Sequence, residues 1–525
     1  MNRLADDVYT VWVVHRRHEL PNWATQVLTE LARQATVSLR QISIANTPPV
    51  RHNNSWNQLI NLLDSQLFPG ADSASTRADL AALPDDIFTK RVHIDTLDQF
   101  TLPLDERDRL LNLSSLPDQA VADALGASVM SLTCGTPYTP VGLHECLAGA
   151  PYIDVKVNRH DARESVVKII ASATECTDAA SIGRTRNAAL WAGAELLLYA
   201  IDAWVSGRET TLSDMPSQTI RHSPPSAWLA LVRAPTFYFR GVQRKLSRRP
   251  LLRQWILLSA ARDDSGDTDR LSLDLQHWDR ILPPRDVFWA DPFVVERDGK
   301  ACVFIEEATF TPRRGHLSVL ELDQDGAPSA AQVVLKKPYH LSYPNVFEHD
   351  DNWYMMPESG EDKSLQVYRC ASWPTEWVWQ ENVLEGKAVF DGTLLEHNGR
   401  WWLFATVQRL DAASPNIFLH LWHADGPLGP WHPHPANPIV SDVRRARPAG
   451  NFFTHDGVLY RPSQDCSTHY GHGLNICRVD QLDLQGYRET LVSTHEPWAA
   501  DIDGVHTLNY AKTRVVADAI HWRPQ

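Results

Sequence analysis

Apolar and polar residues alternate with different periods in the two halves of the chain. A β-branched and aromatic run at 8–15 is followed by a helical period at 22–35 and a second apolar run at 37–44, which predicts a β-α-β unit. Together with the segments below, this predicts an α/β N-terminal domain over residues 1–212. Further strands are predicted at 126–135, 150–158 and 164–173, and a long amphipathic helix at 185–206.

Beyond residue 255 a hairpin pattern occurs five times. Each copy has an alternating apolar strand, a polar turn and a second strand rich in aromatic or β-branched residues, and three of the turns carry Asp-Gly or Asn-Gly. The spacing leaves room for four-stranded blades, and thirteen of the nineteen tryptophans lie from Trp255 onward. The pattern predicts an all-β C-terminal five-bladed β-propeller over residues 255–525. The copies begin at residues 291, 344, 392, 450 and 506.

A connector at 213–254 separates the two predicted domains. Its first part is rich in Pro and Ser, and its second part contains seven basic residues and no acid between residues 233 and 253. Aromatic residues interleave with these charges, a pattern that would suit peripheral contact with an anionic membrane surface through 233–253. The alternative is a basic linker that packs on an acidic domain. The basic residues are Arg233, Arg240, Arg244, Lys245, Arg248, Arg249 and Arg253.

Charge and cysteine content narrow the class of protein. A net charge of −14 argues against nucleic acid as a partner, because phosphate binding needs clustered basic residues. The seven cysteines lack the spacing of a zinc or redox pair, which favours reduced thiols. No secretory signal and no run of eighteen apolar residues is found. We therefore expect a cytoplasmic protein, with possible attachment to the inner face of the membrane, and the sequence leaves its oligomeric state open.

Nine ordered segments in the second half carry a family resemblance. They resemble the propeller domain at the N-terminus of plant glucosamine inositolphosphorylceramide transferases and of bacterial polysaccharide-cluster proteins. More distantly, the propeller is similar to five-bladed glycoside hydrolases and mannoside phosphorylases, in which a carboxylate at the same kind of strand start acts on the sugar. The segments are WADPF, FIEE, LSYPNVF, YMMPES, FDGTLL, GPWHPHPANP, ARPAGNFF, YRPSQDCSTHYG and GVHTLN.

The N-terminal half resembles the formyltransferase-like, Rossmann-type domains that precede this propeller in bacterial relatives. Residues 131–158 fall where such domains carry their catalytic loop. The Asn, His and Asp used for formyl transfer are not found in the matching pattern, since His144 and His160 have different neighbours in the sequence. We therefore expect this domain to have a structural or donor-binding role. It also has no Gly-rich phosphate loop.

The candidate chemistry comes from carboxylates at the ends of the predicted inner strands. Attack at an anomeric carbon needs one group to stabilise positive charge or activate the nucleophile, and often another to protonate the leaving oxygen. Glu306 and Glu307 are adjacent, so only one of them can face the axis. Glu358 follows an apolar run, where a carboxylate is costly to bury without a partner. The predicted catalytic residues are Asp291, Glu307, Glu358 and Asp391.

A second set of polar residues is predicted to bind the sugar. For several of the catalytic and binding candidates a structural role is the alternative: a turn for Asp291 and Asp391, an ion pair for Glu358, a loop contact for Asp465 and a satisfied histidine for His506. Whichever of Glu306 and Glu307 faces away from the axis is expected to be solvated or paired with an arginine such as Arg313. Trp401 and Trp402 are assigned to packing between blades. The predicted binding residues are Glu306, Tyr343, Arg461, Gln464, Asp465, Tyr470 and His506.

No metal site and no cofactor is predicted, although a nucleotide-sugar donor is possible. Four histidines between residues 420 and 434 lie in a proline-rich stretch without the spacing typical of zinc ligands. Three functions remain open. The first is a glycosyltransferase of bacterial cell-surface polysaccharide or glycolipid synthesis, with a sugar donor and a glycan or glycolipid acceptor as its partners. The second is a glycoside hydrolase or phosphorylase, and the third is a non-catalytic carbohydrate-binding scaffold.

Overall fold

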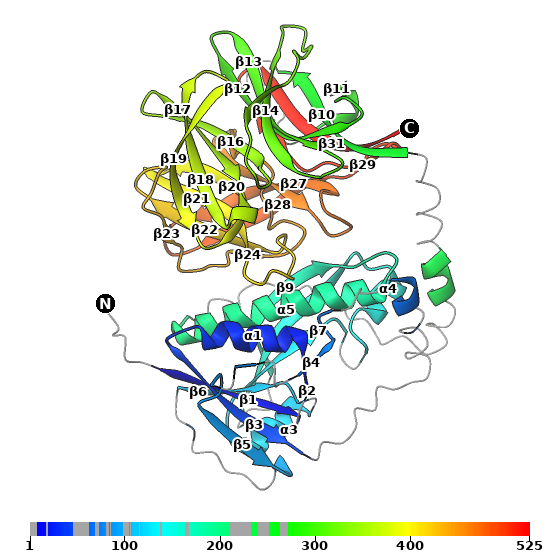
Figure 1. Ribbon diagram of the computed structural model, residues 1–525, viewed down its shortest axis with the longest axis vertical. Helices are drawn as coiled ribbons and strands as arrows, with labels where there is room; N and C mark the ends of the chain where they lie inside the picture. The colour runs from blue at the N-terminus through cyan, green and yellow to red at the C-terminus, as the bar shows by residue number, and fades with distance from the viewer. Residues whose placement is uncertain are drawn as a thin grey trace. The chain divides into compact units, whose positions relative to one another are not determined.

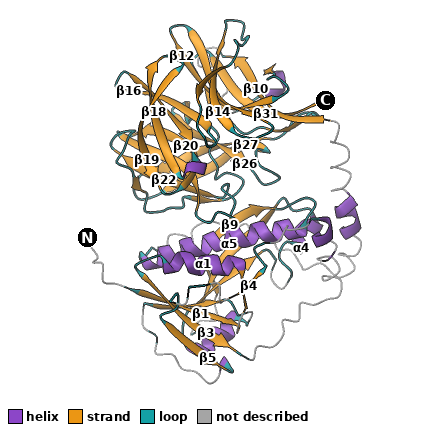
Figure 2. Cartoon of the chain, viewed as in Figure 1, coloured by secondary structure: helices purple, strands orange, loops and turns teal. Residues whose placement is uncertain are grey.

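The chain divides into two compact units, one of Met1–Arg244 with Leu410–Ser414 and one of Lys245–Arg409 with Pro415–Gln525. The described helices lie mainly in the first unit, whereas the second is built from strands (Figure 2). Each unit has hydrophobic clusters of its own. The computed structural model describes residues 8–16, 19–45, 62, 64–68, 73–79, 83–84, 86–97, 104, 107–114, 116–136, 139–162, 167–208, 233–239, 251–262, 271 and 273–524.

A mixed seven-stranded sheet in the order β5-β3-β1-β6-β7-β8-β9 forms the centre of the first unit. The strands from β5 to β7 run parallel to their neighbours, and β8 is antiparallel to both β7 and β9. Two short strands, β2 (Glu19–Pro21) and β4 (Arg77–Asp79), pair separately. The strands of the large sheet are β1 Tyr9–Arg16, β3 Val37–Ile44, β5 Lys90–Ile94, β6 Asp108–Asn112, β7 Val129–Cys134, β8 Tyr152–His160 and β9 Val167–Cys176.

The named helices of this unit are α1 (Asn22–Ala32), α3 (Asp118–Leu125), α4 (Leu143–Ala148) and α5 (Ile182–Val205). The parallel pair β1 and β3, with α1 between them in sequence, confirms the predicted β-α-β unit. The predicted strands and long helix in the rest of the unit appear as β7, β8, β9 and α5. That the domain is formyltransferase-like stays a prediction.

Helix α5 is strongly apolar, although the sequence has no run of eighteen apolar residues. Among the described residues, it is the one helix that is long enough and apolar enough to cross a membrane, with a mean hydropathy of 1.3 over its most apolar stretch. However, 78% of its most apolar stretch is buried, as in the core helix of a folded domain. Its apolar character is therefore explained by packing inside the first unit.

The second unit is a five-bladed β-propeller, as predicted (Figure 1). Its first four blades each begin with their innermost strand and proceed outward along the chain. Blade one is β12 Val287–Arg297, β13 Lys300–Thr309, β14 Gly315–Leu322 and β15 Gln332–Leu335; blade two is β16 Ser342–His349, β17 Asn352–Glu358, β18 Ser364–Ser372 and β19 Glu376–Glu385. Blade three is β20 Ala388–His397, β21 Arg400–Gln408, β22 Phe418–Ala424, β23 His432–Pro433 and β24 Val440–Ser441; blade four is β25 Phe453–His455, β26 Val458–Asp465, β27 Gly473–Leu482 and β28 Tyr487–His495.

Blade five closes the ring with strands from both ends of the propeller. The C-terminal β31 (Arg514–Pro524) pairs with β29 (Ile502–Gly504) and β30 (Leu508–Tyr510) on one side and with β10 (Leu251–Ala261) on the other. The outer strand is β11 (Asp279–Ile281). The pairing of β10 with β31 ties the two ends of the propeller together. Short 3₁₀ turns lie at Leu275–His277 and Gly360–Asp362.

Tight turns join the first two strands of the blades. In three blades the turn is Asp-Gly or Asn-Gly, and both of its residues have positive φ, as two-residue hairpins of this kind require. Blade two has Asp350 and Asp351 in the same conformation, with φ of 48° and 58°. The hairpins of these four blades are therefore confirmed, and the fifth copy, which also lacks glycine in its turn, forms the antiparallel pair β30–β31.

The tryptophans at 401 and 402 pack toward opposite neighbouring blades. The ring of Trp401 lies 6.3 Å from that of Phe347 in blade two. Trp402 is buried in a cluster that also contains Leu482 of blade four. Successive residues of a strand point to opposite faces, so this pair fills both interfaces of blade three, as predicted.

The described parts of the basic connector are engaged within the protein. Ala234 and Phe237, in a helical stretch at 233–239, are buried in a cluster with residues of α4. Arg253, on β10, pairs with Asp503 at 3.2 Å. These contacts favour the packed linker at both ends. Residues 240–250, which include most of the basic side chains, lie outside the described residues.

Candidate active site at the inner strands of the propeller

Irregular pairing places three side chains at corresponding positions of blades one to three. The register shifts between the first two strands at Asp291, at Tyr343 and at Asp391, each just after the start of its inner strand. All three have positive φ, between 46° and 52°, which is uncommon for residues with a side chain. Such bulges redirect side chains, and strained backbone of this kind is frequent at functional sites.

Asp291, on the inner strand of blade one, is bonded to residues of two other blades. Its Oδ1 accepts a hydrogen bond from Thr507 Oγ1 at 3.0 Å, and its Oδ2 accepts one from the backbone N–H of Tyr343 at 3.2 Å. His506 Nε2 lies 3.7 Å from Oδ1, and the backbone N–H of Asp291 donates to Asp518 at 2.9 Å. The side chain is buried, at 3% exposure. Residues from blades one, two and five therefore meet at this carboxyl group.

Arg447 connects the carboxyl groups of blades two and three. Its Nε donates to Asp391 Oδ2 at 2.6 Å, and one terminal nitrogen reaches Asp391 Oδ1 and Glu358 Oε2, each at 3.2 Å. Gln464 Nε2 donates to Asp391 Oδ2 at 2.8 Å. The guanidinium lies over the ring of Tyr470 at 4.9 Å. One buried cation thus serves two buried carboxyl groups.

The two adjacent glutamates on β13 have different environments. Glu306 is buried, lies 3.4 Å from His340, and interacts electrostatically with Asp291 and Glu358. Glu307 accepts a hydrogen bond from Ser318 Oγ at 2.6 Å and lies 3.7 Å from His316 Nε2, on the other face of the strand. Glu306, which was expected only to bind the sugar, therefore lies with the carboxyl groups of Asp291, Glu358 and Asp391. Glu307, which was expected to be catalytic, lies on the opposite face of the strand. We call Asp291, Glu306, Glu358 and Asp391 the carboxylate cluster.

Burial and mutual repulsion favour protonation within the carboxylate cluster. Burial raises the pKa of Asp291 to about 6, against the effect of His506 and with a contribution from Asp391. Burial also raises the pKa of Asp391 to about 7, against the attraction of Arg447. The pKa of Glu306 is raised well above its ordinary range by burial and then by Asp291 and Glu358. Hydrogen bonding from His316 instead lowers the pKa of Glu307. The cluster therefore offers both proton donors and proton acceptors near neutral pH.

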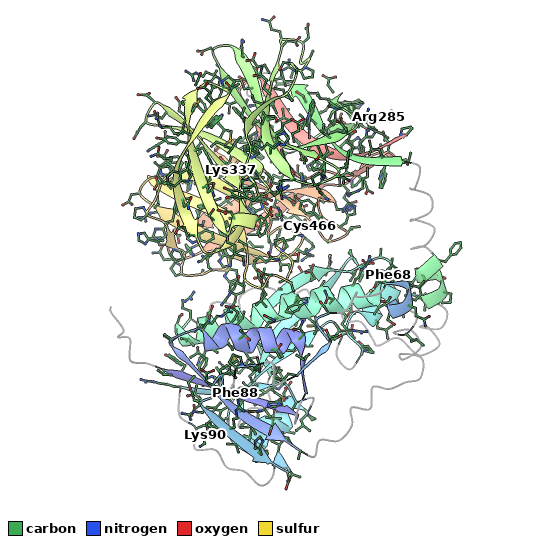
Figure 3. The ribbon with its side chains drawn as sticks, viewed as in Figure 1. Phe68, Phe88, Lys90, Arg285, Lys337 and Cys466 are labelled. Carbon is green, nitrogen blue, oxygen red and sulfur yellow. The ribbon has the colours of Figure 1, made fainter. Side chains whose placement is uncertain are left out.

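Three other predicted residues, Tyr343, Gln464 and Tyr470, lie beside this cluster. The hydroxyl of Tyr343 bonds Thr393 Oγ1 at 2.8 Å and accepts the backbone N–H of Gly450 at 2.6 Å, so this side chain links three blades. Gln464 is engaged by Asp391, and Cys466, labelled in Figure 3, lies 3.7 Å from the Gln464 amide oxygen. Tyr470 keeps 38% of its surface exposed beside Arg447 and His506. This exposure makes it the member of the group that a ligand can reach.

Two predicted binding residues have structural contacts instead. Arg461 is almost fully buried and forms two hydrogen bonds of 2.8 Å with Glu489 on β28, away from the inner strands. Asp465 Oδ1 accepts the backbone N–H of Ser467 at 2.9 Å and so orders its own loop. Their place in a dense polar segment of sequence suggested ligand binding, but strand alternation turns Arg461 away from the axis.

Two residues of the site, Arg447 and Asp518, are not among the predicted ones. Asp518 interrupts the apolar run of β31 and is fully buried. The same reasoning that singled out Glu358, a carboxylate in an apolar strand, would have found it. Arg447 lies in a loop without a periodic pattern, and only the fold brings it to Asp391 and Glu358.

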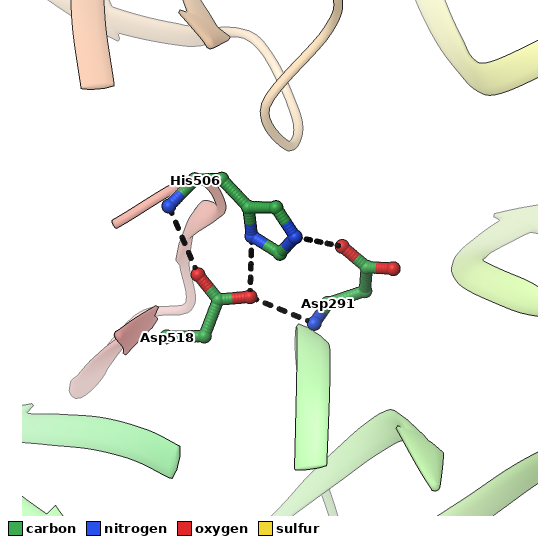
Figure 4. Close-up of side chains that lie close together, drawn as sticks. All are labelled: Asp291, His506 and Asp518. Atoms are coloured by element: carbon green, nitrogen blue, oxygen red, sulfur yellow. Dashed lines mark hydrogen bonds and ion pairs between the residues drawn. The ribbon is translucent and has the colours of Figure 1, made fainter. Parts of the chain in front are cut away.

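Asp291, His506 and Asp518 form a tight group of three (Figure 4). One ligand-type atom from each lies within 4.8 Å of the others. However, both oxygens of Asp518 already accept two hydrogen bonds each from N–H groups. A cation here would have to replace a ring N–H that points at Asp518, so the donor set fits protons better than a metal.

One protein-family model matches most of the propeller. Residues 283–507 match the family model described as glucosamine inositolphosphorylceramide transferase 1, N-terminal. The propeller resembles this domain. The expectation from the nine sequence segments is therefore confirmed for this region, and the matched span contains every member of the carboxylate cluster.

Curated relatives agree with the family match. The chain is 36% identical over 209 residues to glucosamine inositolphosphorylceramide transferase 1 of Oryza sativa subsp. japonica, which covers 39% of this chain and 28% of the relative. It is 33% identical over 208 residues to the protein of the same name from Arabidopsis thaliana, which covers 39% and 27%. The chain thus spans less than a third of the length of these relatives.

Solved structures of similar shape include sugar-cleaving enzymes. Zg3597, a family 117 glycoside hydrolase from Zobellia galactanivorans, aligns with a TM-score of 0.34 and 12% identity, over 52% of this chain and 91% of that chain. The β-xylosidase RS223 aligns with a TM-score of 0.31 and 14% identity, over 46% and 94%.

Proposed function

We propose that the propeller is a sugar-transferring enzyme of glycolipid or cell-surface polysaccharide synthesis, with the carboxylate cluster as its active site. The single observation that carries the proposal is the meeting of four buried carboxyl groups from three blades, with the guanidinium of Arg447 and the imidazoles of His506 and His340 beside them. Such an excess of acids over cations keeps some of them protonated near neutral pH. This is the state that acid and base catalysis at an anomeric carbon uses.

Roles follow from the environments of the carboxyl groups. Glu306, whose pKa is raised well above its usual range, suits protonation of the leaving oxygen. Asp291, with a pKa of about 6, suits activation of the acceptor hydroxyl. Arg447 holds Asp391 and Glu358 in place, and the half-exposed ring of Tyr470 offers a surface on which a sugar can stack.

The relatives' name supports transfer over hydrolysis, because they are called transferases. A donor such as a nucleotide sugar and a glycan or glycolipid acceptor would be the partners. A bacterial and cytoplasmic setting, with membrane contact through the basic connector, belongs to the same proposal. The relatives extend well beyond the matched region, so this chain's own turnover has to be measured directly.

The test is a binding and turnover screen of the full chain. We expect a nucleotide sugar to raise the melting temperature, since a ligand of the native state stabilises it, and labelled sugar to appear on a lipid or glycan acceptor. Glu306→Gln keeps the shape of a neutral carboxyl group but cannot give up its proton, so it should bind the donor and lose turnover by about 100-fold or more. Asp291→Asn should do the same.

His277→Gln serves as the matched control, because His277 forms an exposed pair with Asp274 outside the site. Release of sugar to water without an acceptor would replace the proposal with a hydrolase. Glycan binding with no turnover, unchanged in Glu306→Gln, would replace it with a carbohydrate-binding scaffold.

A further inference from the structure

His506 lies between two carboxyl groups from different strands (Figure 4). Its Nδ1 is 2.7 Å from Asp518 Oδ2 on β31, and its Nε2 is 3.7 Å from Asp291 Oδ1 on β12. All three residues are at most 3% exposed. His506 is in hydrogen-bond contact with Asp518 and lies 3.7 Å, slightly beyond hydrogen-bond distance, from Asp291. The three side chains therefore lie in a row that ends at the carboxylate cluster, and a small approach of His506 to Asp291 completes the connection.

The contacts of Asp518 determine which ring nitrogen carries hydrogen. Its Oδ1 accepts the backbone N–H groups of His506 and Thr507, at 3.1 and 3.0 Å, and its Oδ2 accepts the N–H of Asp291 at 2.9 Å. A carboxylate held by three N–H donors is an acceptor only, so Nδ1 must donate to it. In the neutral ring, Nε2 then faces Asp291 with its lone pair.

The imidazole ring is held in this orientation from both sides. It stacks on Trp255 of β10 at 4.0 Å with an angle of 20°, and Tyr470 meets it edge-on at 5.4 Å. Gly471, at φ +69°, lets the chain pass: a Cβ there would come within 2.6 Å of the Trp255 ring. The ring cannot turn away from Asp291 without moving these neighbours.

We propose that His506, oriented by Asp518, is a positioning residue that exchanges a proton with Asp291 and so controls the protonation state of that carboxyl group. The inference rests on the proposed function of the carboxylate cluster. In the exchange, the O–H bond of Asp291 breaks and an Nε2–H bond forms. The product is an imidazolium between two carboxylates, and the reverse step returns the proton to Asp291.

Other charged groups around this pair act in both directions. Glu306 on β13, Glu358 on β17 and Asp391 on β20 add negative charge, while Arg447, Arg313 and His340 oppose it. Burial lowers the pKa of His506, but the attraction of Asp518 and then Asp291 outweighs it and raises that pKa above its ordinary value. The pKa of Asp291 is raised to about 6 and that of His506 is raised above its ordinary value, and the protonation of each group depends on that of the other.

The experiment follows the ring nitrogens of His506 by ¹⁵N NMR of the full chain, with His506→Gln to assign the signals. We expect Nδ1 to stay protonated and Nε2 to titrate. In Asp291→Asn, loss of the carboxylate should lower the midpoint of His506 by about one pH unit or more. In Asp518→Asn, the Nδ1 signal should change as well. If that variant does not fold, Asp291→Asn carries the test alone.

A second readout is the pH dependence of turnover. An imidazolium beside Asp291 lowers its pKa, so in His506→Gln the acid limb of kcat/KM should move to higher pH by about one unit. His277→Gln should leave both the limb and the His506 signals unchanged. If the protein shows no sugar transfer while His506 still responds to Asp291→Asn, the proposed function fails and the proton exchange stands.

Two results would overturn the inference. One is a His506 midpoint that does not respond to Asp291→Asn. The other is displacement of the Nδ1 proton by added Ca²⁺ or Zn²⁺ together with a rise in melting temperature, which would make the group a cation site.

Discussion

Buried carboxyl groups occur in both units, but they are satisfied in different ways. In the first unit, Asp64 accepts hydrogen bonds from the N–H groups of Ile182 and Gly183 at the start of α5, and from Ser181 and Tyr238. The helix dipole also favours a negative charge there. In the propeller, by contrast, four carboxyl groups share Arg447 and two histidines, His506 and His340.

This difference indicates when a buried carboxyl group can act as an acid or base. A carboxylate with a complete set of neutral donors, like Asp64, is a structural element that stabilises a helix end. The carboxylate cluster instead has too few cations for its charges, so protons must make up the balance. We infer that the shortage of partners, rather than burial itself, distinguishes the candidate site.

The largest effect is expected from removing the shared cation. Arg447→Met would leave Asp391 and Glu358 buried without a counter-charge and should cost about 3–5 kcal/mol at pH 8. The loss should be smaller at pH 5, because the pKa of Asp391 is about 7 and the group is then protonated. Urea denaturation followed by tryptophan fluorescence measures it. An equal loss at both pH values would contradict this account, and Arg478→Met, in an exposed pair with Asp480, is the control.

A buried acid without a charged partner should show its cost as a pH dependence. Burial raises the pKa of Glu175 on β9 to about 7, and its Oε2 has no hydrogen-bond partner among the described residues. A raised folded-state pKa gives stability that is present below the unfolded value and is lost as pH rises through about 7.

Glu175→Gln should therefore be more stable than the wild type at pH 8.5 by up to about 3 kcal/mol, with little difference at pH 4.5. Thermal denaturation at the two pH values measures this. A variant curve parallel to that of the wild type would show that Glu175 is ionised at no cost. Asp123→Asn, an exposed change in the same unit, is the control.

A smaller effect is expected at Asp64. Asp64→Asn turns an N–H donor toward the start of α5, where the backbone already donates, and should destabilise the first unit by about 2 kcal/mol. Hydrogen exchange of the amides of residues 182–185 would increase most. The exposed Asp95→Asn should change neither quantity, and unchanged exchange in Asp64→Asn would show that the cap is dispensable.

The smallest effect is expected from Tyr238→Phe. It removes one of four hydrogen bonds to Asp64, a contact of 2.9 Å, and should cost about 1 kcal/mol while the ring stays packed. The measurement is thermal denaturation of the full chain. A cost as large as that of Asp64→Asn would mean that the stretch 233–239 is held mainly by this bond instead of by the burial of Phe237.

Local patterns in the sequence were sufficient for most elements of the fold. Turn residues and alternation identified all five hairpins, and the apolar runs located β1, β3, β7 and α5. These features depend on neighbours along the chain, which the sequence displays directly. The same reasoning selected Asp291 and Asp391, which lie on the inner strands β12 and β20, and Glu358, which ends β17, the second strand of blade two.

Which charged side chains come together at the carboxylate cluster depends on contacts between distant parts of the chain. Asp291 and its partner Thr507 are 216 residues apart, and they come together because β10 and β31 close the ring. The register of β13 directs Glu306 toward the cluster and Glu307 away from it. Arg447 reaches the cluster from the loop between β24 and β25. The sequence pattern was enough to predict a propeller with acids near its axis, because the periodicity that reveals strands and turns is local. The composition and protonation of the site depend on long-range contacts, which no local pattern records.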